Sequence, residues 1–357
     1  MAKIGIGIIG SGGIAQACHM PGYAACADRC EIVAVADIDE QRANEAAERF
    51  GVKHVFVDYC DLLALADVHA VSIATPNRDH KQPAIDALRA GKHVLLEKPM
   101  AMNGEECREI LCAQRESGAV LQIGLQYRFS SIGKFLGDYV RAGRMGEIYY
   151  ARAMALRRRG VPTWGVFIDK ERQGGGPLID IGVHILDFTL FAMGHPRPVS
   201  ASAKAWQQLG KDPSLWNQWG DYDRDKFTVE DAAVGLIRFD NGAVVTLEAS
   251  FMLNIGDDQM RCELMGTRSG ATVDLLREPS LMFYTEDNRQ LFDMIPRNLP
   301  RVDSMYTEEV KAFLNAIEIG GPSPVPGEQG LILNAIFDAM YRSSESGREE
   351  PVYADPV

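Results

Sequence analysis

The chain has 357 residues, which suits two domains at the usual size of about 100–200 residues each. Hydrophobic residues make up 46% and charged residues 24%, an ordinary globular composition. The formal net charge of −12 argues against a nucleic-acid binder and against a partner on an anionic membrane surface. The longest stretch without acidic or basic residues, 4–27, contains many glycines and polar residues that do not suit a bilayer.

The cysteines and the first residues of the chain bear on where in the cell the protein is located. The seven cysteines show no zinc-finger spacing, so we expect reduced thiols. No basic segment followed by an apolar run and a cleavage site is visible near the start, so we expect no secretion signal. Together these features predict a cytoplasmic protein.

The first third of the chain alternates apolar runs with helical patterns. Continuous apolar runs are typical of strands buried in a parallel sheet, and strands alternating with helices indicate βαβ units. The expected strands are 4–9, 31–36, 68–74, 94–96 and 119–123. The expected helices are an Ala-rich segment to about residue 27, then 41–50, 82–90 and 105–117.

A glycine-rich turn, Gly10-Ser-Gly-Gly-Ile-Ala15, joins the first strand to the Ala-rich segment. Gly10 allows a tight turn, Gly12 lets the backbone approach a pyrophosphate, and the following helix N-terminus attracts phosphate. Asp37 ends the second strand about 20 residues later, where an acid binds ribose hydroxyls. These positions predict a dinucleotide site that includes Gly10, Gly12, Gly13, Ile14 and Asp37.

The same acid bears on the choice of cofactor. Asp37 would repel a 2′-phosphate, and no arginine directly follows it. Arg42 lies farther along, on what we expect to be a solvated helix face. The sequence therefore favours NAD over NADP.

The pattern changes after about residue 125. Helices are expected at 129–142 and 178–193, with strands at 148–156, 229–239 and 243–252, the last two joined by the hairpin sequence Asp240-Asn-Gly242. Further strands are expected at 260–265, 271–275, 281–284 and 291–295, then helices at 305–319 and 328–346. This pattern indicates an α+β domain with an antiparallel sheet. We predict domains at 1–125 and 126–357, with the last helices as candidates to pack back on the first domain.

Two groups of polar residues lie on apolar elements. Lys98, in Glu97-Lys98-Pro99, follows a parallel strand at the end where ligands bind, and it can donate to a substrate oxygen. Asp180 and His184 have the spacing that places them on one helical face, and Asp187 continues that face. Ionisable groups on a buried helix need partners or a function. The three could instead bind a metal, although no further His or Cys cluster lies nearby, and we predict no metal.

Aromatic and basic residues in the second part are less specific. Trp164 lies in a Gly- and Pro-containing loop and could stack on a sugar or a nicotinamide. Trp216 and Trp219 lie in a polar insertion. Packing or subunit contact explains these tryptophans as well as ligand binding does. The run Arg157-Arg-Arg159 could hold an anion, but such runs are usually solvated.

The motifs together resemble the glucose–fructose oxidoreductase, inositol dehydrogenase and MocA family. The resemblance spans nearly the whole chain. The residues that carry it are Gly10-Ser-Gly-Gly-Ile-Ala15, Ala36-Asp37, Thr75-Pro76-Asn77 with His80, Glu97-Lys98-Pro99, Tyr127-Arg128-Phe129, Gly174-Gly-Gly-Pro-Leu-Ile-Asp-Ile-Gly-Val-His184 and Tyr341-Arg-Ser-Ser-Glu-Ser-Gly347.

The resemblance implies a Rossmann dinucleotide-binding domain followed by an open-faced antiparallel sheet domain that builds homodimers or homotetramers. It implies Lys98, Asp180 and His184 as the catalytic group. It suggests that Thr75, Asn77, His80, Glu97 and Lys98 lie beside the cofactor. It also suggests Arg128 near the nicotinamide or the substrate. With Trp164, this gives the expected substrate-binding residues: Lys98, Arg128, Trp164, Asp180 and His184.

The predicted activity is NAD-dependent transfer of a hydride between a secondary alcohol of a sugar, sugar derivative or inositol and nicotinamide C4. His184 suits a general base near neutral pH, and Lys98 would stabilise the developing alkoxide. Asp180 would orient His184 or bind a neighbouring hydroxyl. Three alternatives stay open: an NADPH-dependent reductase of a keto- or anhydro-sugar, a non-catalytic cofactor-binding regulator, and a metal-dependent enzyme using Asp180, His184 and Asp187.

Overall fold

The chain forms two compact units, neither of which is continuous in sequence. A computed structural model describes residues 3–355. The first unit consists of the described residues up to 130 together with 302–331, and the second consists of 131–301 and 332–355. The last part of the chain therefore contributes to both units.

The first unit contains a parallel sheet with the strand order β3-β2-β1-β4-β5-β6. The strands are β1 (Ile4–Ile9), β2 (Cys30–Ala36), β3 (His54–Phe56), β4 (Ala70–Ile73), β5 (His93–Glu97) and β6 (Leu121–Gly124). The predicted parallel sheet is confirmed, and only the short β3 was not expected. Since the chain places β2 and β3 on one side of β1 and β4 to β6 on the other, the sheet has a switch point between β1 and β4, where ligands bind in such folds.

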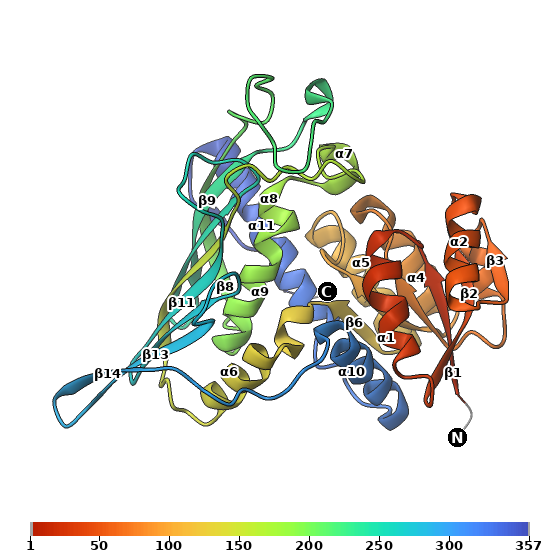
Figure 1. The fold of residues 1–357 in the computed structure, drawn as a ribbon, viewed down its shortest axis with the longest axis horizontal. Helices are drawn as coiled ribbons and strands as arrows, with labels where there is room; N and C mark the ends of the chain where they lie inside the picture. Colours follow the sequence, from red (N-terminus) through yellow and green to blue (C-terminus); the bar gives the residue numbers. More distant parts are fainter. Residues whose placement is uncertain (1–2, 356–357) are drawn as a thin grey trace. The chain divides into compact units, whose positions relative to one another are not determined.

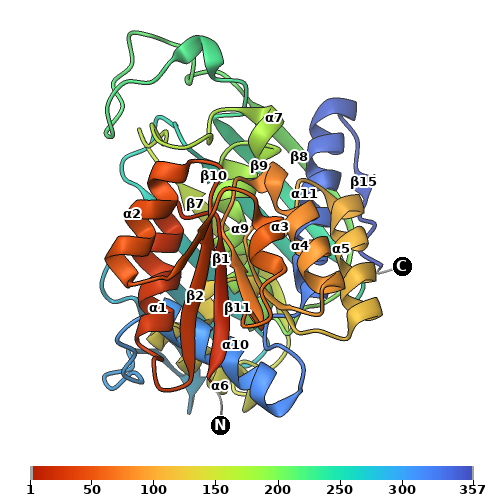
Figure 2. The ribbon, with the colours of Figure 1, turned by 90° about the vertical axis from the view of Figure 1, so that its right-hand side faces the viewer.

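Helices flank this sheet on both sides (Figure 2). They are η1 (Ala15–His19), a π-helical turn that leads into α1 (Met20–Ala24), then α2 (Glu40–Phe50), α3 (Tyr59–Leu63), η2 (Asn77–Asp79), α4 (Lys81–Arg89), α5 (Gly104–Ser117), η3 (Gln126–Phe129) and α10 (Met305–Ile319). Four of these described helices, α2, α3, α5 and α10, start at a side-chain cap, as at α2, where Asp39 accepts a hydrogen bond from Arg42 N–H.

The late segment 302–331 is hydrogen-bonded to the last strand of this sheet. The buried Gln122 amide donates to Glu309 O at 3.0 Å and accepts from Ser323 Oγ at 3.2 Å. Ile123 N–H also donates to Val325 O at 3.0 Å. Residues far apart in sequence thus complete the β6 side of the first unit.

The second unit is built on a mixed sheet with the order β14-β13-β12-β11-β7-β10-β9-β8-β15, in which only β7 and β10 pair in parallel. The strands are β7 (Ile148–Leu156), β8 (Pro198–Trp206), β9 (Ala232–Phe239), β10 (Val244–Ser250), β11 (Gln259–Gly266), β12 (Gly270–Asp274), β13 (Leu281–Asp287), β14 (Gln290–Met294) and β15 (Glu350–Pro351). The predicted hairpin joins β9 to β10, but β8 and β15 were not predicted.

Helices of the second unit are α6 (Ser131–Arg141), α7 (Lys170–Gln173), α8 (Pro177–Asp180), α9 (Gly182–Ala192) and most of α11 (Gly327–Ser346), the remainder of which belongs to the first unit. Helix α9 is apolar almost all round and packs against β7, β10 and β11. Figure 1 shows α9 beside the sheet. Strand β7 shows the matching period-two pattern of burial, in which Ala151, Ala153 and Ala155 are buried.

The predicted continuous helix 178–193 is wrong, because the helix breaks at Ile181. Gly182 starts the second piece close to β10, where an added Cβ would come within 3.4 Å of the Ala249 methyl group. Within residues 3–355, no single helix is long and apolar enough to cross a bilayer, while the pair 170–180 and 182–192, bent by 46°, passes on length and composition alone.

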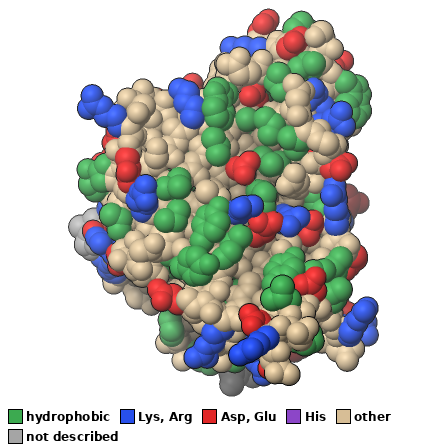
Figure 3. Space-filling view, turned by 90° about the vertical axis from the view of Figure 1, so that its left-hand side faces the viewer, with side chains coloured by type: hydrophobic (Ala, Val, Ile, Leu, Met, Phe, Trp, Pro, Cys, Tyr) green, Lys and Arg blue, Asp and Glu red, His purple; other side chains and the backbone are tan. Residues whose placement is uncertain are grey.

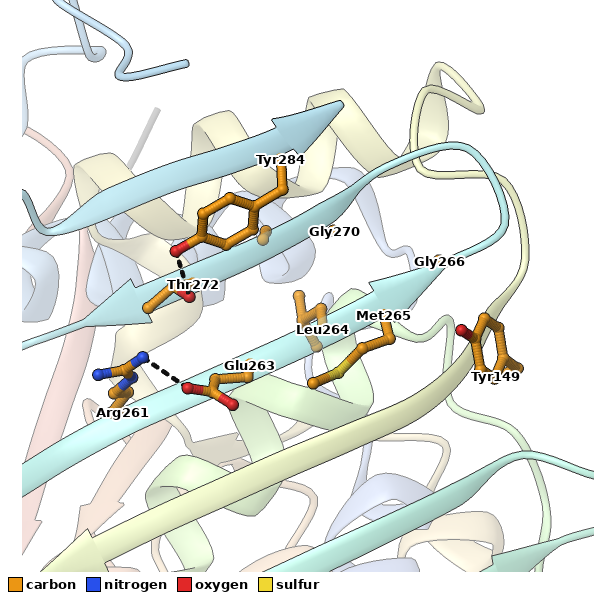
Figure 4. A pocket seen from close by; sticks show the side chains of 10 residues that line it. Tyr149, Arg261, Glu263, Leu264, Met265, Gly266, Gly270, Thr272 and Tyr284 are labelled. Atoms are coloured by element: carbon orange, nitrogen blue, oxygen red, sulfur yellow. Dashed lines mark hydrogen bonds and ion pairs between the residues drawn. The ribbon is translucent and has the colours of Figure 1, made fainter. Parts of the chain in front are cut away.

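The sheet face away from α9 mixes hydrophobic and charged side chains (Figure 3). A depression of about 400 Å³ on this sheet is lined by side chains that include Tyr149, Met265 and Tyr284 (Figure 4). Arg261 and Glu263 form an ion pair there, and Tyr284 is hydrogen-bonded to Thr272. None of the predicted catalytic or cofactor-binding residues lines this depression.

Candidate functional site

The predicted cofactor-binding residues of the first unit follow the carboxyl ends of its strands. Gly10 follows β1, Asp37 follows β2, Thr75 lies just beyond β4, and Lys98 follows β5. Asn77 opens the short turn after β4, with an exposed fraction of 8%. This is the edge of a doubly wound sheet at which nucleotides bind.

The glycine-rich turn has the shape that a pyrophosphate needs. Gly10 has φ +84°, and an added Cβ would lie 2.9 Å from the backbone of Ala74 and Thr75, so a side chain is excluded there. Gly12 and Gly13 have no heavy atom within 4 Å of an added Cβ, which leaves open space beside the turn. A dinucleotide therefore fits this cradle, with backbone N–H groups at the start of the helix available to phosphate.

The Asp37 carboxylate fixes the turn. It accepts hydrogen bonds from Ser11 N–H at 2.8 Å, from the Ser11 hydroxyl at 3.1 Å and from Asp39 N–H at 2.9 Å. Arg42 lies in the first turn of α2, and its guanidinium comes within 3.5 Å of the same carboxylate. Arg42 is exposed, as expected for a solvated helix face, but the contact with Asp37 was not predicted from the sequence.

His80 links the loops that follow β4 and β5. Its imidazole is buried, with Nδ1 2.8 Å from Pro99 O and Nε2 2.9 Å from Thr75 O. Burial lowers the pKa of His80, and the two carbonyl contacts and Glu97 only partly offset this effect. His80 thus connects the loops that follow β4 and β5, and its suggested position beside the cofactor stays a prediction.

We expect the free energy of unfolding to decrease as the pH is lowered from about 7 to about 5. Folding holds His80 neutral, whereas the unfolded chain takes up a proton near pH 6.5, so acid favours unfolding. His80→Gln should reduce this slope in urea unfolding measured at several pH values. Burial also lowers the pKa of His93, so His93→Gln serves as the comparison. An unchanged slope in His80→Gln would contradict the assignment.

The sequence analysis missed a buried network beside Lys98. His19 Nδ1 lies 2.6 Å from Ser72 Oγ, and its Nε2 lies 2.8 Å from Glu97 Oε1. Although burial by itself would raise the pKa of Glu97, the hydrogen bond and charge of His19, followed by the charges of Lys98 and His80, lower it. Glu97 is therefore ionised at neutral pH, and His19 Nε2 donates to it.

Glu97 also holds the backbone at Lys98. Its second carboxylate oxygen accepts the Lys98 N–H at 3.1 Å. Gly124 on β6 makes room for this carboxylate, since an added Cβ would lie 3.2 Å from Glu97 Oε1. The signal for this network was present in the sequence, because His19 is an ionisable residue in an otherwise Ala-rich helix, the same feature that marked His184.

Asp180 and His184 lie in the second unit, on either side of the helix break. Asp180 is the last residue of α8 and is 9% exposed, and His184 lies in α9. The prediction that Asp180 and His184 share one helical face assumed a continuous helix, so it does not hold in that form. Lys98 belongs to the first unit, so the three predicted catalytic residues come from both units.

Helix α8 is held by a buried carboxylate that the sequence analysis did not single out. Glu230 accepts hydrogen bonds from Gly176 N–H at 2.9 Å, from Leu178 N–H at 3.2 Å and from the Tyr341 hydroxyl at 2.9 Å. Burial raises the pKa of Glu230 despite these bonds. Glu230 thereby positions the start of the helix that carries Asp180.

The remaining predicted substrate-binding residues have different surroundings. Arg128 is 5% exposed and donates to the Gln329 side chain, within the first unit. Trp164 is 54% exposed, in the second unit. Among residues 3–355, no group of three or more His, Cys, Asp or Glu side chains is arranged to hold a metal ion.

Comparison with known proteins matches both parts of the chain to one family. Residues 4–125 match the family described as "Oxidoreductase family, NAD-binding Rossmann fold", and residues 138–353 match its C-terminal alpha/beta domain. The chain is 38% identical over 344 residues to D-glucoside 3-dehydrogenase of Escherichia coli, covering 96% of this chain and 95% of the relative. It is 29% identical over 299 residues to levoglucosan dehydrogenase of Pseudarthrobacter phenanthrenivorans, covering 79% and 76%.

A solved structure of levoglucosan dehydrogenase in complex with NADH has the same fold, with a TM-score of 0.87 at 24% identity, covering 99% of this chain and 100% of that chain. The predicted fold class and the predicted NAD-binding domain are thus confirmed. An enzyme, rather than a non-catalytic regulator, is also confirmed. The chain belongs to the glucose–fructose oxidoreductase, inositol dehydrogenase and MocA family of NAD-binding oxidoreductases.

Proposed function

We propose that the protein oxidises a secondary alcohol of a sugar or sugar derivative, with glucosides and anhydro-sugars as the first substrates to test. The observation that carries the proposal is the match over both domains to relatives named D-glucoside 3-dehydrogenase and levoglucosan dehydrogenase. NAD, when bound, supplies the hydride acceptor at nicotinamide C4. The protein must then bind the alcohol, remove its proton and stabilise the oxygen.

Three side chains are proposed to share this work on one substrate molecule. His184 takes the hydroxyl proton, because imidazole is a suitable base near neutral pH. Lys98 donates to the same oxygen and stabilises the negative charge that develops there. Its backbone is held by the ionised Glu97, which the buried His19 keeps in place. Asp180 orients His184 or binds a neighbouring hydroxyl.

The test is a screen for NADH formation, followed by absorbance, with methyl D-glucosides, levoglucosan, myo-inositol and D-xylose as substrates. We expect a turnover with a glucoside or levoglucosan that exceeds the turnover with the other two. A reaction that runs only with NADPH and a keto-sugar would replace this proposal with the reductase alternative. No turnover with any of them in either direction would overturn it.

We expect Asp37→Ser to weaken the preference for NAD over NADP by about ten- to a hundredfold in kcat/KM. The substitution removes the charge that repels a 2′-phosphate and leaves the Arg42 guanidinium, now 3.5 Å from Asp37, to attract one. The ratio of initial rates at limiting NAD and NADP measures this change. Asp39→Ser, which removes the other carboxylate near Arg42, is the matched control and should leave most of the preference.

We also propose that the protein forms a homodimer or homotetramer through the face of the nine-stranded sheet that carries the Tyr149 and Tyr284 side chains. These aromatic side chains are 52% and 40% exposed, in a surface that also holds the Arg261–Glu263 pair (Figure 4). Light scattering should give a mass above that of the monomer. The double variant Tyr149→Glu/Tyr284→Glu should shift it towards the monomer, and an unchanged mass would contradict this interface.

A further inference from the structure

Two exposed indole rings of the second unit form an angled pair, here called the tryptophan corner and consisting of Trp164 and Trp219. Their ring centroids lie 5.1 Å apart with the planes at 61°. Trp164 is 54% exposed and Trp219 is 38% exposed. Large aromatic side chains are usually buried, so a pair held open to solvent needs an explanation.

The loops that carry the corner are fastened to each other by hydrogen bonds. Asn217 is only 3% exposed, and its side-chain amide accepts from Val161 N–H at 2.9 Å and donates to Val161 O at 3.0 Å and to Gly220 O at 2.9 Å. The Thr163 hydroxyl donates to Trp219 O at 3.0 Å. The rings are therefore displayed on a fixed backbone, and a ligand need not order the loops on binding.

The basic residues next to the corner bind the protein itself. The Arg157 guanidinium lies 4.9 Å from the Trp219 ring and donates to Gly160 O. Arg159 donates to Leu253 O and to the Asn254 side chain. The run Arg157-Arg-Arg159 thus braces the loops. Since Arg157 already stacks over the Trp219 ring, the corner offers a ligand the remaining exposed indole surface, which suits a neutral ligand.

Backbone hydrogen bonds place the corner at the same end of the sheet as α8. Gly160 N–H donates to Phe251 O, and Phe251 N–H donates to Asp231 O. The preceding residue, Glu230, caps the start of α8, whose last residue is Asp180. The tryptophan corner and one proposed catalytic residue therefore belong to one connected part of the second unit.

We propose that the tryptophan corner is a subsite for a pyranose ring that is joined by a glycosidic bond to the ring being oxidised. The C–H groups of a pyranose form a weakly positive, apolar face, which stacks on the negative face of an indole, while its hydroxyls stay in water. Two indole rings provide far less area than the roughly 1,200–2,000 Å² that a stable protein interface buries, which favours a small ligand. The inference rests on the proposed function and names its substrate class: disaccharides and larger glycosides rather than free monosaccharides.

The test compares cellobiose and maltose with the methyl β- and α-D-glucosides, which lack the second ring. Wild-type enzyme should have a higher kcat/KM for at least one disaccharide than for the matching methyl glucoside. Trp219→Ala should reduce that ratio by about three- to tenfold, the worth of one aromatic contact, and Trp219→Phe should restore part of it. Trp216→Ala, on the same loop but outside the corner, is the matched control and should keep the wild-type ratio.

A second readout does not depend on turnover. Without NAD, either disaccharide should change the tryptophan fluorescence of the wild type, and the change should be smaller in Trp219→Phe. If no sugar is oxidised but this binding signal is present, the subsite stands and the proposed activity fails. If methyl glucosides are oxidised without any disaccharide preference or signal, the activity stands and the subsite is overturned. The subsite is also overturned if Trp219→Ala lowers kcat/KM equally for disaccharides and methyl glucosides. It is likewise overturned if this substitution changes the mass of the oligomer.

Discussion

Lys98→Ala and His184→Ala should each lower kcat by at least about a hundredfold, the lower range for the loss of an acid–base group. Each substitution removes one of the groups proposed to handle the proton and the charge on the substrate oxygen. Neither residue belongs to the glycine-rich cradle, so NAD should still raise the melting temperature of both variants. Initial rates with the best substrate of the screen, together with thermal shift, measure the two effects.

Exposed residues of the same types provide the controls. Lys53→Ala and His54→Ala alter side chains on the surface of the first unit, at the start of β3, and should keep nearly wild-type rates. A rate within threefold of wild type in Lys98→Ala or His184→Ala would remove that residue from the proposed mechanism. A loss of NAD binding together with activity would instead indicate that the residue contributes to cofactor binding, as the resemblance suggests for Lys98, and an unchanged melting temperature without NAD would exclude structural damage.

His19→Ala should lower the free energy of unfolding by about 3–5 kcal/mol, the range for a buried ion left without its partner. The side chains of His19 and Glu97 are 1% and 9% exposed, so the Glu97 carboxylate cannot exchange its partner for bulk water. Because Glu97 also accepts the Lys98 N–H, the kcat of the variant should fall more than its affinity for NAD changes. Urea unfolding and steady-state kinetics measure the two effects.

A double-mutant cycle separates this pair from simple loss of packing. Glu97→Gln removes the charge, so adding His19→Ala to it should cost less than His19→Ala costs alone. His54→Ala, an exposed histidine in the same unit, should change stability by no more than about 0.5 kcal/mol. Additive losses in the cycle would show that His19 contributes packing rather than a partner for the Glu97 carboxylate.

The sequence predicted the parallel sheet well because its strands are continuous apolar runs that the fold buries on both faces. Three strands were missed for identifiable reasons. The segment His54–Phe56 is short, Glu350–Pro351 is shorter, and Pro198–Trp206 consists largely of Ala and Ser, which have little preference for strands. These strands form through pairing with neighbouring strands, as β8 does with β9. The hydrophobic pattern within a short segment does not predict such pairing.

Candidate site residues could be picked out from the sequence where one residue type meets a structural requirement of its immediate neighbours in the chain. Gly10 and Asp37 stand out in the sequence because a turn with positive φ and an acid at a strand end each leave a signature within a few residues. The partners of Glu97 and Glu230 were not found, because His19 and Tyr341 reach them from 78 and 111 residues away in sequence. The break at Ile181 was also not predicted, since the apolar pattern continues through it without interruption.

The divided first unit has a consequence for synthesis on the ribosome. Gln122 and Ile123 emerge early, yet the groups that bond them, Glu309 O, Ser323 and Val325 O, are made only after nearly all of the second unit. The second unit in turn waits for 332–355. Nascent chains therefore carry a nucleotide-binding sheet whose β6 edge lacks these partners until the last helices leave the exit tunnel. During that interval β6 is an edge strand without its later partners, and unpaired strand edges are prone to wrong pairing and aggregation.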